Sequence, residues 1–440
     1  MKLVAKRFIA IALTFLFIII SCISTYAYNG NFNKINNEEG LSQNTIQCMI
    51  QDKLGFIWIG TNDGLNRYNG YEFKIYKYDK NNSNSIAGNN IIDLLEDKNN
   101  NIWIATSNGL SKINTITNEV FNYSNKKESG NLSYYMTTDI LLTSNGKILV
   151  ATFDGLNLYN EKTDSFERIL KDDDLISQTI YSIEEDINGD FWIATSKGVS
   201  RIVTKDKKIY NYPATLNGES GQMSSGDYIF KIKCDSQGYL WASTFRYGLY
   251  KIDLKDYSFV KYSHDENDDT SLPGNLVKDV LRDKNNQVWV ATNNGLASYN
   301  EEDETFTTYS KKSYDRKSII QNEVYSLMQD NSGIIWVGTY SGVNIFDPEI
   351  KIEHYENNPL DENSISESLV TTIYEDKNKY LWVGTYSGGI NLINRDTGEI
   401  TRLGSNEEYD VIVSDHINYI TGDKDEIYIA TDYGLNILNT

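Results

Sequence analysis

Residues 51 to 68 of this 440-residue chain read Gln51-Asp52-Lys53-Leu54-Gly55-Phe56-Ile57-Trp58-Ile59-Gly60-Thr61-Asn62-Asp63-Gly64-Leu65-Asn66-Arg67-Tyr68. The same pattern returns eight more times, and all seven tryptophans stand at one position of it. The nine positions are separated by 45, 46, 43, 49, 48, 47, 46 and 46 residues, and they are Trp58, Trp103, Leu149, Trp192, Trp241, Trp289, Trp336, Trp382 and Tyr428. A period of this length, kept along the chain, indicates a repeat architecture.

Each copy of the repeat predicts four short antiparallel strands. An apolar strand such as 91–95 is followed by Asp-x-x-Gly or Asp-x-x-Asn, which predicts a hairpin turn because Gly and Asn tolerate positive φ. The tryptophan strand is apolar on both faces, as is typical of a strand between neighbouring sheets. A second turn ends in glycine, as at Gly64, and two more strands follow, the last marked by aromatic residues. Four strands per repeat predict one blade of a β-propeller, so we expect an all-β fold of nine such repeats.

The two ends of the repeat region bear on how the blades close. The chain begins with an unmatched fourth strand near 32–35, and it ends at 435–438 with a third strand that has no fourth. In a closed ring, an N-terminal strand completes the last blade. This count leaves two arrangements open: a single nine-bladed ring, or a seven-bladed ring followed by two blades of an incomplete second ring.

The N-terminus, residues 1–27, predicts an export signal or anchor. Three basic residues (Lys2, Lys6, Arg7) precede an apolar run over 8–20, and Thr25-Tyr26-Ala27 offers small residues for cleavage before Tyr28. The run is short for a membrane-spanning helix, so we favour cleavage. The alternatives are an uncleaved anchor through 8–23, or a lipid on Cys22, whose preceding residues loosely match a lipobox. In each case we expect the repeats to be extracytoplasmic, in the periplasm or at the cell surface.

Composition argues against several classes of partner. The chain has 41 Lys plus Arg against 61 Asp plus Glu, a net charge of −20. Because such a surface repels phosphate groups, we expect no nucleic-acid partner and no binding to anionic membrane surfaces. Two cysteines, Cys48 and Cys234, follow the signal in apolar strand contexts, and they predict neither a disulfide framework nor a zinc site.

Two segments between residues 40 and 73 are distinctive: Gly40-Leu41-Ser42-Gln43-Asn44-Thr45-Ile46 and Asn66-Arg67-Tyr68-Asn69-Gly70-Tyr71-Glu72-Phe73. In these segments the sequence resembles the two-component regulator propeller family. Later copies follow the pattern Asp-x-x-Gly-x-x-Trp-Ile-Gly-Thr-x-x-Gly-Leu-x-x-Tyr, and the resemblance covers essentially residues 30 to 440. This family comprises extracytoplasmic sensor regions of hybrid histidine kinases and related receptors.

The resemblance implies a particular division of the chain. In the family, two seven-bladed propellers precede a β-sandwich, a membrane helix and a cytoplasmic output domain. Residues 338–348 resemble the last blade of the first ring, and residues 384–391 carry one extra residue, as often opens the second. The resemblance therefore implies a seven-bladed propeller over 28–350 and two further repeats over 351–440. We expect no output domain in these 440 residues, which leaves a fragment, a frameshifted gene or a free-standing binding protein open.

Catalytic and metal-binding patterns are weak in this sequence. The three histidines, His264, His354 and His416, are unrelated by the repeat and have no metal-ligand spacing. The chain contains neither a Gly-x-Ser-x-Gly motif nor a phosphate-binding loop. We therefore predict no catalytic residues, no metal, no cofactor and no enzymatic activity.

A binding site is better sought where the copies diverge at one structural position. The turn between the second and third strands is such a position, because in a propeller these turns lie at one rim beside the connections between blades. Most copies place small polar residues there, whereas four copies place aromatic residues: Phe153-Asp154, Phe245-Arg246-Tyr247, Tyr340-Ser341 and Tyr386-Ser387. Aromatic rings beside polar groups suit stacking on sugar faces, and Arg246 suits a carboxylate or hydroxyls. We predict Phe245, Arg246 and Tyr247 as the main ligand contacts, with Phe153, Asp154, Tyr340 and Tyr386 as further candidates. The competing interpretation is that these rings pack against neighbouring blades.

Together these observations favour an extracytoplasmic sensor that binds a small ligand, an oligosaccharide in the leading hypothesis. Two alternatives stay open. One is a secreted propeller lyase or glycosidase, since architecture does not decide function. The other is a scaffold that binds protein, or a second copy of the chain as a homodimer, through the rim.

Overall fold

The computed structural model describes residues 32–124, 131–170, 172–213, 228–313, 315, 317–349, 355–359, 361–395, 397–404, 412–423 and 426–439. The proposed signal over 1–27 and His354 lie outside these residues. The chain divides into two compact units, one on each side of the boundary between residues 350 and 351. Among the described residues, no helix has the length and apolar character that crossing a membrane requires.

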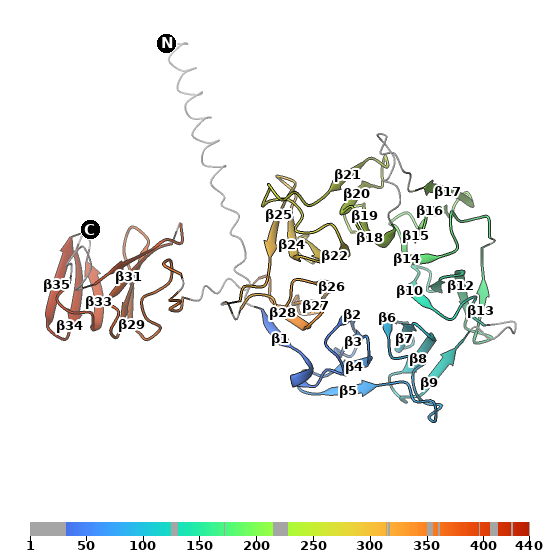
Figure 1. The fold of residues 1–440 in the computed structure, drawn as a ribbon, viewed down its shortest axis with the longest axis horizontal. Coiled ribbons are helices and arrows are strands. Elements are labelled where there is room, and N and C mark those ends of the chain that lie inside the picture. Colours follow the sequence, from blue (N-terminus) through green and yellow to red (C-terminus); the bar gives the residue numbers. More distant parts are fainter. Residues whose placement is uncertain are drawn as a thin grey trace, which may run out of the picture. The chain divides into compact units, whose positions relative to one another are not determined.

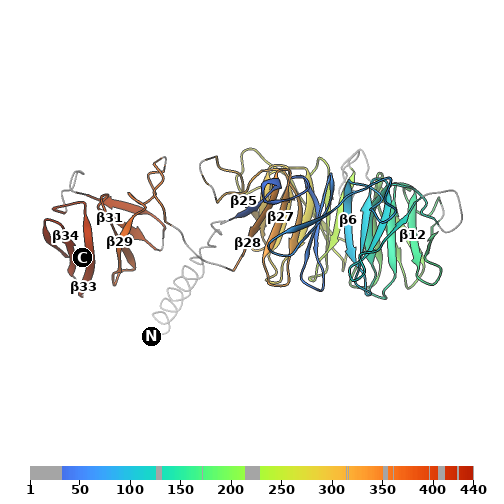
Figure 2. The same ribbon diagram turned by 90° about the horizontal axis from the view of Figure 1, so that it is seen from below.

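The prediction of an all-β propeller built from four-stranded blades is confirmed. The first unit holds seven four-stranded sheets arranged around a centre (Figure 1), and their strands run roughly along the short axis of the ring (Figure 2). The innermost strands of the seven blades are β2 (Ile46–Gln51), β6 (Ile91–Glu96), β10 (Thr137–Leu142), β14 (Ile180–Glu185), β18 (Ile229–Cys234), β22 (Val277–Arg282) and β26 (Val324–Gln329).

The strands of the first unit follow the blade order. Blade 1 contains β2 (Ile46–Gln51), β3 (Ile57–Thr61), β4 (Gly64–Tyr68) and β5 (Phe73–Tyr76); blade 2 contains β6 (Ile91–Glu96), β7 (Asn101–Thr106), β8 (Gly109–Asn114) and β9 (Val120–Tyr123). Blade 3 contains β10 (Thr137–Leu142), β11 (Ile148–Thr152), β12 (Gly155–Asn160) and β13 (Ser165–Arg168); blade 4 contains β14 (Ile180–Glu185), β15 (Phe191–Thr195), β16 (Gly198–Val203) and β17 (Lys208–Pro213). Blade 5 contains β18 (Ile229–Cys234), β19 (Tyr239–Thr244), β20 (Leu249–Asp253) and β21 (Phe259–Tyr262); blade 6 contains β22 (Val277–Arg282), β23 (Val288–Thr292), β24 (Gly295–Asn300) and β25 (Thr305–Tyr309). Blade 7 contains β26 (Val324–Gln329), β27 (Ile335–Thr339), β28 (Gly342–Phe346) and the N-terminal strand β1 (Asn33–Ile35).

The ring of the first unit is closed by its N-terminal strand. β1 pairs antiparallel with β28, with Lys34 opposite Asn344, so the two ends of this unit share one sheet. Phe32, just before β1, is buried, and its ring lies 4.8 Å from the ring of Phe346. The cluster of Ile46 and Met49 with Met328 and Trp336 then packs blade 1 against blade 7. Strand pairing therefore joins blade 7 to β1, and apolar contact joins blade 7 to blade 1.

The second strand of each blade is buried because blades pack on both of its faces. All five residues of β3 are buried, and Trp58 is fully covered in a cluster that includes Ile91 and Ile102 of blade 2. The same arrangement recurs around the ring, so the core is a series of clusters between blades. Burial on both faces is the physical reason for the uninterrupted apolar residues around each tryptophan.

A hydrogen bond from the indole explains why an aspartate stands six residues before each tryptophan. Asp52 Oδ2 accepts a 2.8 Å bond from Trp58 Nε1, and its Oδ1 accepts from the backbone N–H groups of Leu54 and Phe56. Six further pairs repeat this contact: Asp97–Trp103, Asp186–Trp192, Asp235–Trp241, Asp283–Trp289, Asp330–Trp336 and Asp376–Trp382. The aspartate thus closes the first hairpin turn and satisfies the buried indole.

The turn between the second and third strands is held by a threonine and a glycine. Thr61 Oγ1 donates to the carbonyl of Gly64 at 2.8 Å and accepts from the N–H of Asp63. Gly64 has a φ of 117°, which favours glycine. Because these two residues define the turn, the residues between them can vary without loss of the fold.

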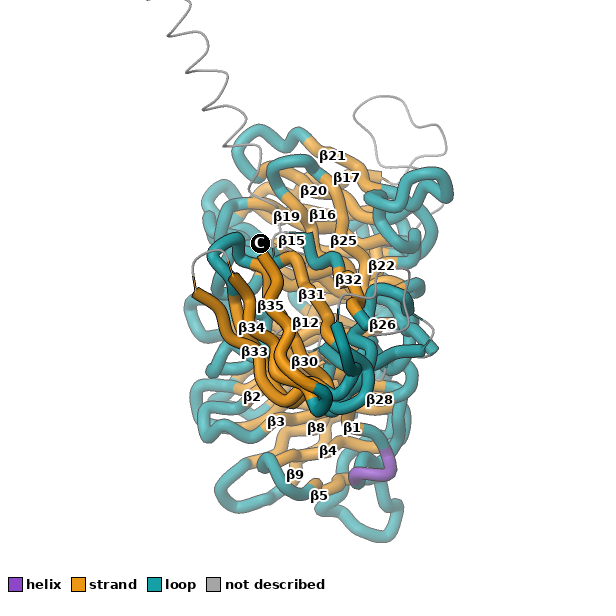
Figure 3. Tube along the Cα trace, turned by 90° about the vertical axis from the view of Figure 1, so that its left-hand side faces the viewer, coloured by secondary structure: helices purple, strands orange, loops and turns teal. Residues whose placement is uncertain are grey.

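The second unit holds two blades. Its first sheet contains β29 (Val370–Glu375), β30 (Tyr380–Thr385), β31 (Ile390–Asn394) and β32 (Ile400–Leu403), and its second contains β33 (Ile417–Asp423), β34 (Glu426–Thr431) and β35 (Gly434–Asn439). Strands make up nearly all regular structure, and the 3-10 turn η1 (Asn37–Glu39) of the first unit is the helical element that Figure 3 marks. One cluster, which includes Trp382, Ile417 and Ile429, packs the two sheets together.

Candidate functional site

The turns proposed to bind a ligand lie beside the connections that lead into the next blade. Phe245 follows β19, and its N–H donates to the carbonyl of Tyr228 at 3.3 Å, just before β18 of the same blade. Gly248, after the turn, donates to the carbonyl of Asn275, which precedes β22 of blade 6. The rim between blades 5 and 6 is therefore built from one turn and the following connection.

A surface cavity of about 420 Å³, wide open to solvent, lies at this rim. Its lining includes Phe245 and Arg246 from the turn of blade 5, Asn293 and Asn294 from the same turn of blade 6, and His264 from the connection between them. The connection also contributes the segment from Pro273 to Leu276. Two of the three main predicted contacts therefore line one cavity, together with a histidine that the sequence did not indicate.

The chemistry of this cavity combines an aromatic face with polar groups. The ring of Phe245 is 42% exposed, so it is available for contact, and Arg246 is exposed beside it. The Nδ1 of His264 lies 2.9 Å from the carbonyl oxygen of Leu272. When the ring is neutral and Nδ1 donates to this carbonyl, Nε2 is left as an acceptor. A guanidinium donor, an imidazole acceptor and an aromatic face suit a polar ligand with an apolar side.

Local sequence explains the shape of the cavity. The turn of blade 5 has one residue more than most copies, so Thr244 Oγ1 reaches the carbonyl of Gly248 four residues on. Gly274 must be small, because a Cβ there would lie 2.4 Å from Asn293 Oδ1. Asn275 Oδ1 accepts from the N–H of His264 at 2.8 Å and fixes the start of the connection.

Tyr247, the third main prediction, does not line this cavity. Its ring is 38% exposed and lies 5.2 Å from Lys261 Nζ of β21. In this longer turn, Phe245 and Arg246 therefore lie on the side of blade 6, whereas Tyr247 lies against β21 of its own blade.

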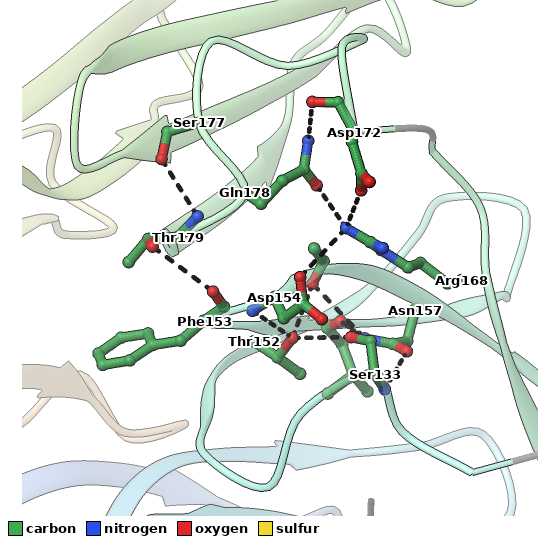
Figure 4. A network of polar contacts seen from close by, with 12 residues as sticks. Ser133, Thr152, Phe153, Asp154, Asn157, Arg168, Asp172, Ser177, Gln178 and Thr179 are labelled. Carbon is green, nitrogen blue, oxygen red and sulfur yellow. Dashed lines mark hydrogen bonds and ion pairs between the residues drawn. The ribbon is translucent and has the colours of Figure 1, made fainter. Parts of the chain in front are cut away.

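Phe153 and Asp154 occupy the corresponding turn of blade 3, where they do different things. Asp154 forms a 3.2 Å ion pair with Arg168, which also pairs with Asp172 at 2.8 Å and donates a 3.1 Å hydrogen bond to Gln178 Oε1 (Figure 4). The ring of Phe153 points away from this network (Figure 4) and meets Tyr181 of blade 4 at 5.8 Å. The network gives Asp154 a structural partner in the turn.

The remaining predicted contacts are not brought together with the cavity. Tyr340, in the turn of blade 7, is 52% exposed. Tyr386 belongs to the second unit, where its ring lies 4.2 Å from the ring of His416 of the next blade. His416 Nδ1 in turn lies 2.9 Å from Asp432 Oδ2.

The sequence pattern does not indicate a set of residues on the innermost strands. Each of these strands has a β-bulge near its start, as between Ile180 and Ser182 or between Ile229 and Lys231. The residue within the bulge is Gln47, Ile92, Thr138, Tyr181, Phe230, Lys278 or Tyr325 in blades 1 to 7. Because the bulge interrupts the two-residue alternation of a strand, the pattern alone does not show which way these side chains face.

The next position of each bulge carries a second set, which includes the ionisable side chains of Asp93, Asp139, Lys231 and Asp279. Asp93, Asp139 and Lys231 occupy it in blades 2, 3 and 5, and Lys231 Nζ lies 3.1 Å from Asp139 Oδ1. Asp139 Oδ2 accepts from Ser182 Oγ at 2.8 Å and from the N–H of Ile183 at 2.7 Å. These side chains therefore bind the innermost strand of one blade to that of the next.

Two of the three carboxyl groups of this set, Asp93 and Asp139, are held in different protonation states. Burial, together with the charge of Asp139 nearby, raises the pKa of Asp93 to about 8. Burial would also raise the pKa of Asp139, but Lys231 and hydrogen bonds from Asp93, Ile183 and Ser182 hold it below its ordinary value. The charges of Asp139 and Asp93 outweigh burial at Lys231 and raise its pKa. At neutral pH, Asp93 is accordingly a protonated donor to an ionised Asp139.

Other candidate groups add little to a reactive site. Cys48 is buried and Cys234 partly buried, both are free thiols, and burial raises the pKa of each. Within the described part of the chain, no three His, Cys, Asp or Glu side chains are grouped so as to hold a metal ion.

Comparison with known proteins agrees with the repeat. The model of the two-component regulator propeller matches residues 40–63, 85–108, 174–197, 271–294, 318–341 and 364–387. A protein named Histidine kinase P4, from Formosa agariphila, is 46% identical over 57 residues, which are 12% of this chain and 4% of that protein.

Solved structures share the fold. An extracellular domain assigned to a hybrid two-component system of B. thetaiotaomicron matches with a TM-score of 0.74 and 23% identity, over 93% of this chain and 53% of that chain. An extracellular domain assigned to a one-component system of the same organism matches with a TM-score of 0.59 and 18% identity, over 94% of this chain and 59% of the other. A streptogramin B lyase matches with a TM-score of 0.52 and 13% identity, over 71% of this chain and 96% of that chain.

The chain spans about half the length of the first of these structures and a small part of the kinase. At these identities the structural likeness establishes the fold, which a sensor domain and a lyase share. The family model goes further, because it matches the repeat itself in six of the nine copies. This chain is a β-propeller protein, and six of its nine repeats match the model of the two-component regulator propeller.

Proposed function

We propose that this chain is the extracytoplasmic ligand-binding region of a two-component-type receptor, and that it binds an oligosaccharide at the rim between blades 5 and 6. The repeat family and the extracellular domains that share the fold support a sensor role. The basic and apolar N-terminal sequence supports export. In this proposal the output domain belongs to a part of the receptor beyond these 440 residues.

The observation that carries the ligand assignment is the meeting of Phe245, Arg246 and His264 around one cavity. A volume of about 420 Å³ suits one or two sugar rings, since small-molecule sites typically measure about 300–1,000 Å³. Phe245 would stack on the apolar face of a ring, while Arg246 and His264 would bond its hydroxyl groups. The openness of a rim lets a longer saccharide continue outside the cavity.

Calorimetric titration of the purified chain against a panel of neutral and acidic oligosaccharides tests this proposal. We expect Arg246→Ala to weaken binding about tenfold or more, since a hydrogen bond to a charged group contributes about 1.5–3 kcal/mol. We expect Phe245→Ala to weaken binding up to about tenfold, because it removes the stacking surface. Ser107→Ala is the matched control, because Ser107 takes the place of Phe245 in the turn of blade 2. An unchanged affinity in both rim variants would refute the site.

The same titrations separate binding from catalysis. Chromatography of the saccharide after incubation should return it intact if the chain is a sensor. Cleaved product that is formed by the parent chain but not by His264→Ala would instead favour a propeller lyase or glycosidase. The streptogramin B lyase is an enzyme that shares this fold.

A further inference from the structure

Side chains from five blades form a continuous series around the centre of the ring, which we call the aromatic arc. It consists of Phe153, Tyr181, Tyr228, Phe230, Lys278 and Tyr325. The ring of Tyr181 lies 5.8 Å from Phe153, 5.9 Å from Tyr228 and 6.5 Å from Phe230. Four of the six residues occupy the bulge of an innermost strand, in the consecutive blades 4 to 7. The bulge residues of blades 1 to 3 are Gln47, Ile92 and Thr138, so the arc occupies one side of the ring.

One cation stands within this aromatic arc. Lys278 Nζ lies 4.8 Å from the ring centre of Phe230 and 5.0 Å from that of Tyr325, between residues of the preceding and the following blade. Burial lowers the pKa of Lys278, and the charge of Glu323 opposes that effect only in part. No carboxylate of the described residues lies within ion-pair distance of this ammonium.

Lys231, on the innermost strand of the preceding blade, is a lysine that stabilises the fold. Its ammonium lies 3.1 Å from Asp139, and the nearby carboxylates raise its pKa. Lys278 lies on the next innermost strand, yet it faces aromatic rings and loses hydration without gaining an ionic partner. The two rings offset part of the lost hydration through cation–π contact, and an anion that reached the ammonium would offset more of it.

The arc has the groups that one class of ligand requires. Aromatic faces stack on the C–H face of a sugar ring, and a lysine ammonium binds a carboxylate through charge-assisted hydrogen bonds. The aromatic surroundings lower the local polarity, which strengthens that ionic contact relative to the solvent-exposed surface. A neutral sugar would satisfy the rings and leave the ammonium without a partner.

We propose that the aromatic arc is a second binding site, which takes a saccharide unit bearing a carboxylate, with its ring on Phe230 and Tyr325 and its carboxylate on Lys278. This inference takes from the proposed function only that the ligand is a saccharide. The site itself is separate, because the arc shares no side chain with the cavity between blades 5 and 6. The site accepts uronic acid units and discriminates against their neutral esters.

Titration with tetragalacturonate and with its methyl ester tests this site, because the two ligands share a backbone and differ in charge. We expect the acid to bind at least about tenfold more tightly, and we expect added salt to weaken the acid only. Lys278→Met should abolish this preference, whereas Phe230→Ala should weaken both ligands. Equal affinity for acid and ester, binding of neither, or an unchanged preference in Lys278→Met would overturn the proposal.

Arg246→Ala separates the two sites. If the arc is independent, this variant keeps the preference for the acid even where it abolishes binding at the rim cavity. A preference lost in Arg246→Ala and retained in Lys278→Met would assign the acidic sugar to the rim and refute the arc. A preference that depends on Lys278, combined with no effect of either rim variant on any saccharide, would support the arc and refute the proposed rim site.

Discussion

Trp58 Nε1 donates a 2.8 Å hydrogen bond to Asp52 Oδ2 across the first turn of blade 1. Both side chains are buried, and the other oxygen of Asp52 accepts two backbone N–H groups of the turn. One carboxylate thereby satisfies three donors. The pair couples the turn to the apolar contact between blades, since the indole packs among residues of blade 2.

Replacing Asp52 with alanine should therefore lower the free energy of unfolding by about 2–3 kcal/mol, because it leaves buried donors without an acceptor. Denaturant titration followed by tryptophan fluorescence measures the change. Blade 3 offers a control, since Leu149 replaces the tryptophan there and Thr143 replaces the aspartate. Thr143→Ala should cost less than Asp52→Ala, and equal losses would show that the indole bond contributes nothing.

Sequence was sufficient for the blades because the residues that repeat are those that the fold requires. Trp58, Gly64 and the residues around them recur for packing and turn geometry, so their period predicts the number of repeats. The rim site was predictable in part, since Phe245 and Arg246 diverge at a constant position. His264 was not, because the corresponding residues of other copies, such as Tyr78 and Lys311, are not histidines, and because it reaches the cavity only through the path of a connection.

The aromatic arc was hidden from the sequence for a different reason. Tyr181, Phe230 and Tyr325 lie in β-bulges, where an extra residue changes which side chains face the centre. A strict alternation assigns them to the wrong face. The hydrogen bond between tryptophan and aspartate could not be predicted either, because the role of the aspartate in the hairpin turn already explains why it recurs.

Closure of the ring predicts a large effect at a residue near the start of the described chain. Phe32 is 4% exposed, between the rings of Phe346 and Tyr309. Phe32→Ala should lower the free energy of unfolding by about 3–5 kcal/mol, the usual cost of emptying a buried aromatic position. Tyr71→Ala is the control, because that ring is 95% exposed. Equal stability of the two variants would show that the N-terminal strand does not hold the ring closed.

The carboxyl pair at the centre of the ring predicts a pH dependence of stability. The folded chain keeps a proton on Asp93 up to about pH 8, whereas the unfolded chain releases it near the ordinary value of 3.8. The folded state thus binds more protons between these values, and this contribution to stability falls as the pH rises from about 4 to about 8.

Asp93→Asn should flatten that dependence, because an amide can still donate to Asp139 and accept from the N–H of Ile140 without titrating. At pH 8 the variant should be more stable than the parent by about 1 kcal/mol or more, since one pKa unit corresponds to about 1.4 kcal/mol. Denaturant titrations at pH 5 and pH 8 measure this, with the exposed Asp269→Asn as a control. A variant with the same pH dependence as the parent would contradict the shared proton.

Removal of the positive charge should affect the stability of the chain differently at the two lysines near the ring centre. Lys231→Met leaves the buried carboxylate of Asp139 without its cation and should lower the free energy of unfolding by about 3 kcal/mol. Lys278→Met removes a cation that burial disfavours and that two aromatic rings stabilise in part, so stability should change by less than about 1 kcal/mol. Thermal unfolding of the two variants in parallel provides the comparison. A strong destabilisation by Lys278→Met would mean that its ammonium serves the fold instead of a ligand.

The two-blade unit should be the part of the described chain that opens most readily. Ile373 is 60% exposed, whereas Met49, at the same position of blade 1, is 7% exposed; Leu435 is 61% exposed, whereas its counterpart Leu65 is fully buried. In a repeat protein each interface between neighbours adds stability, and here the two blades share one interface between them. Amide hydrogen exchange, which reports local opening, should therefore be faster in β33, β34 and β35 than in β2, β3 and β4. Equal protection of the two sets of strands would show that the apolar faces of Ile373 and Leu435 are covered in solution.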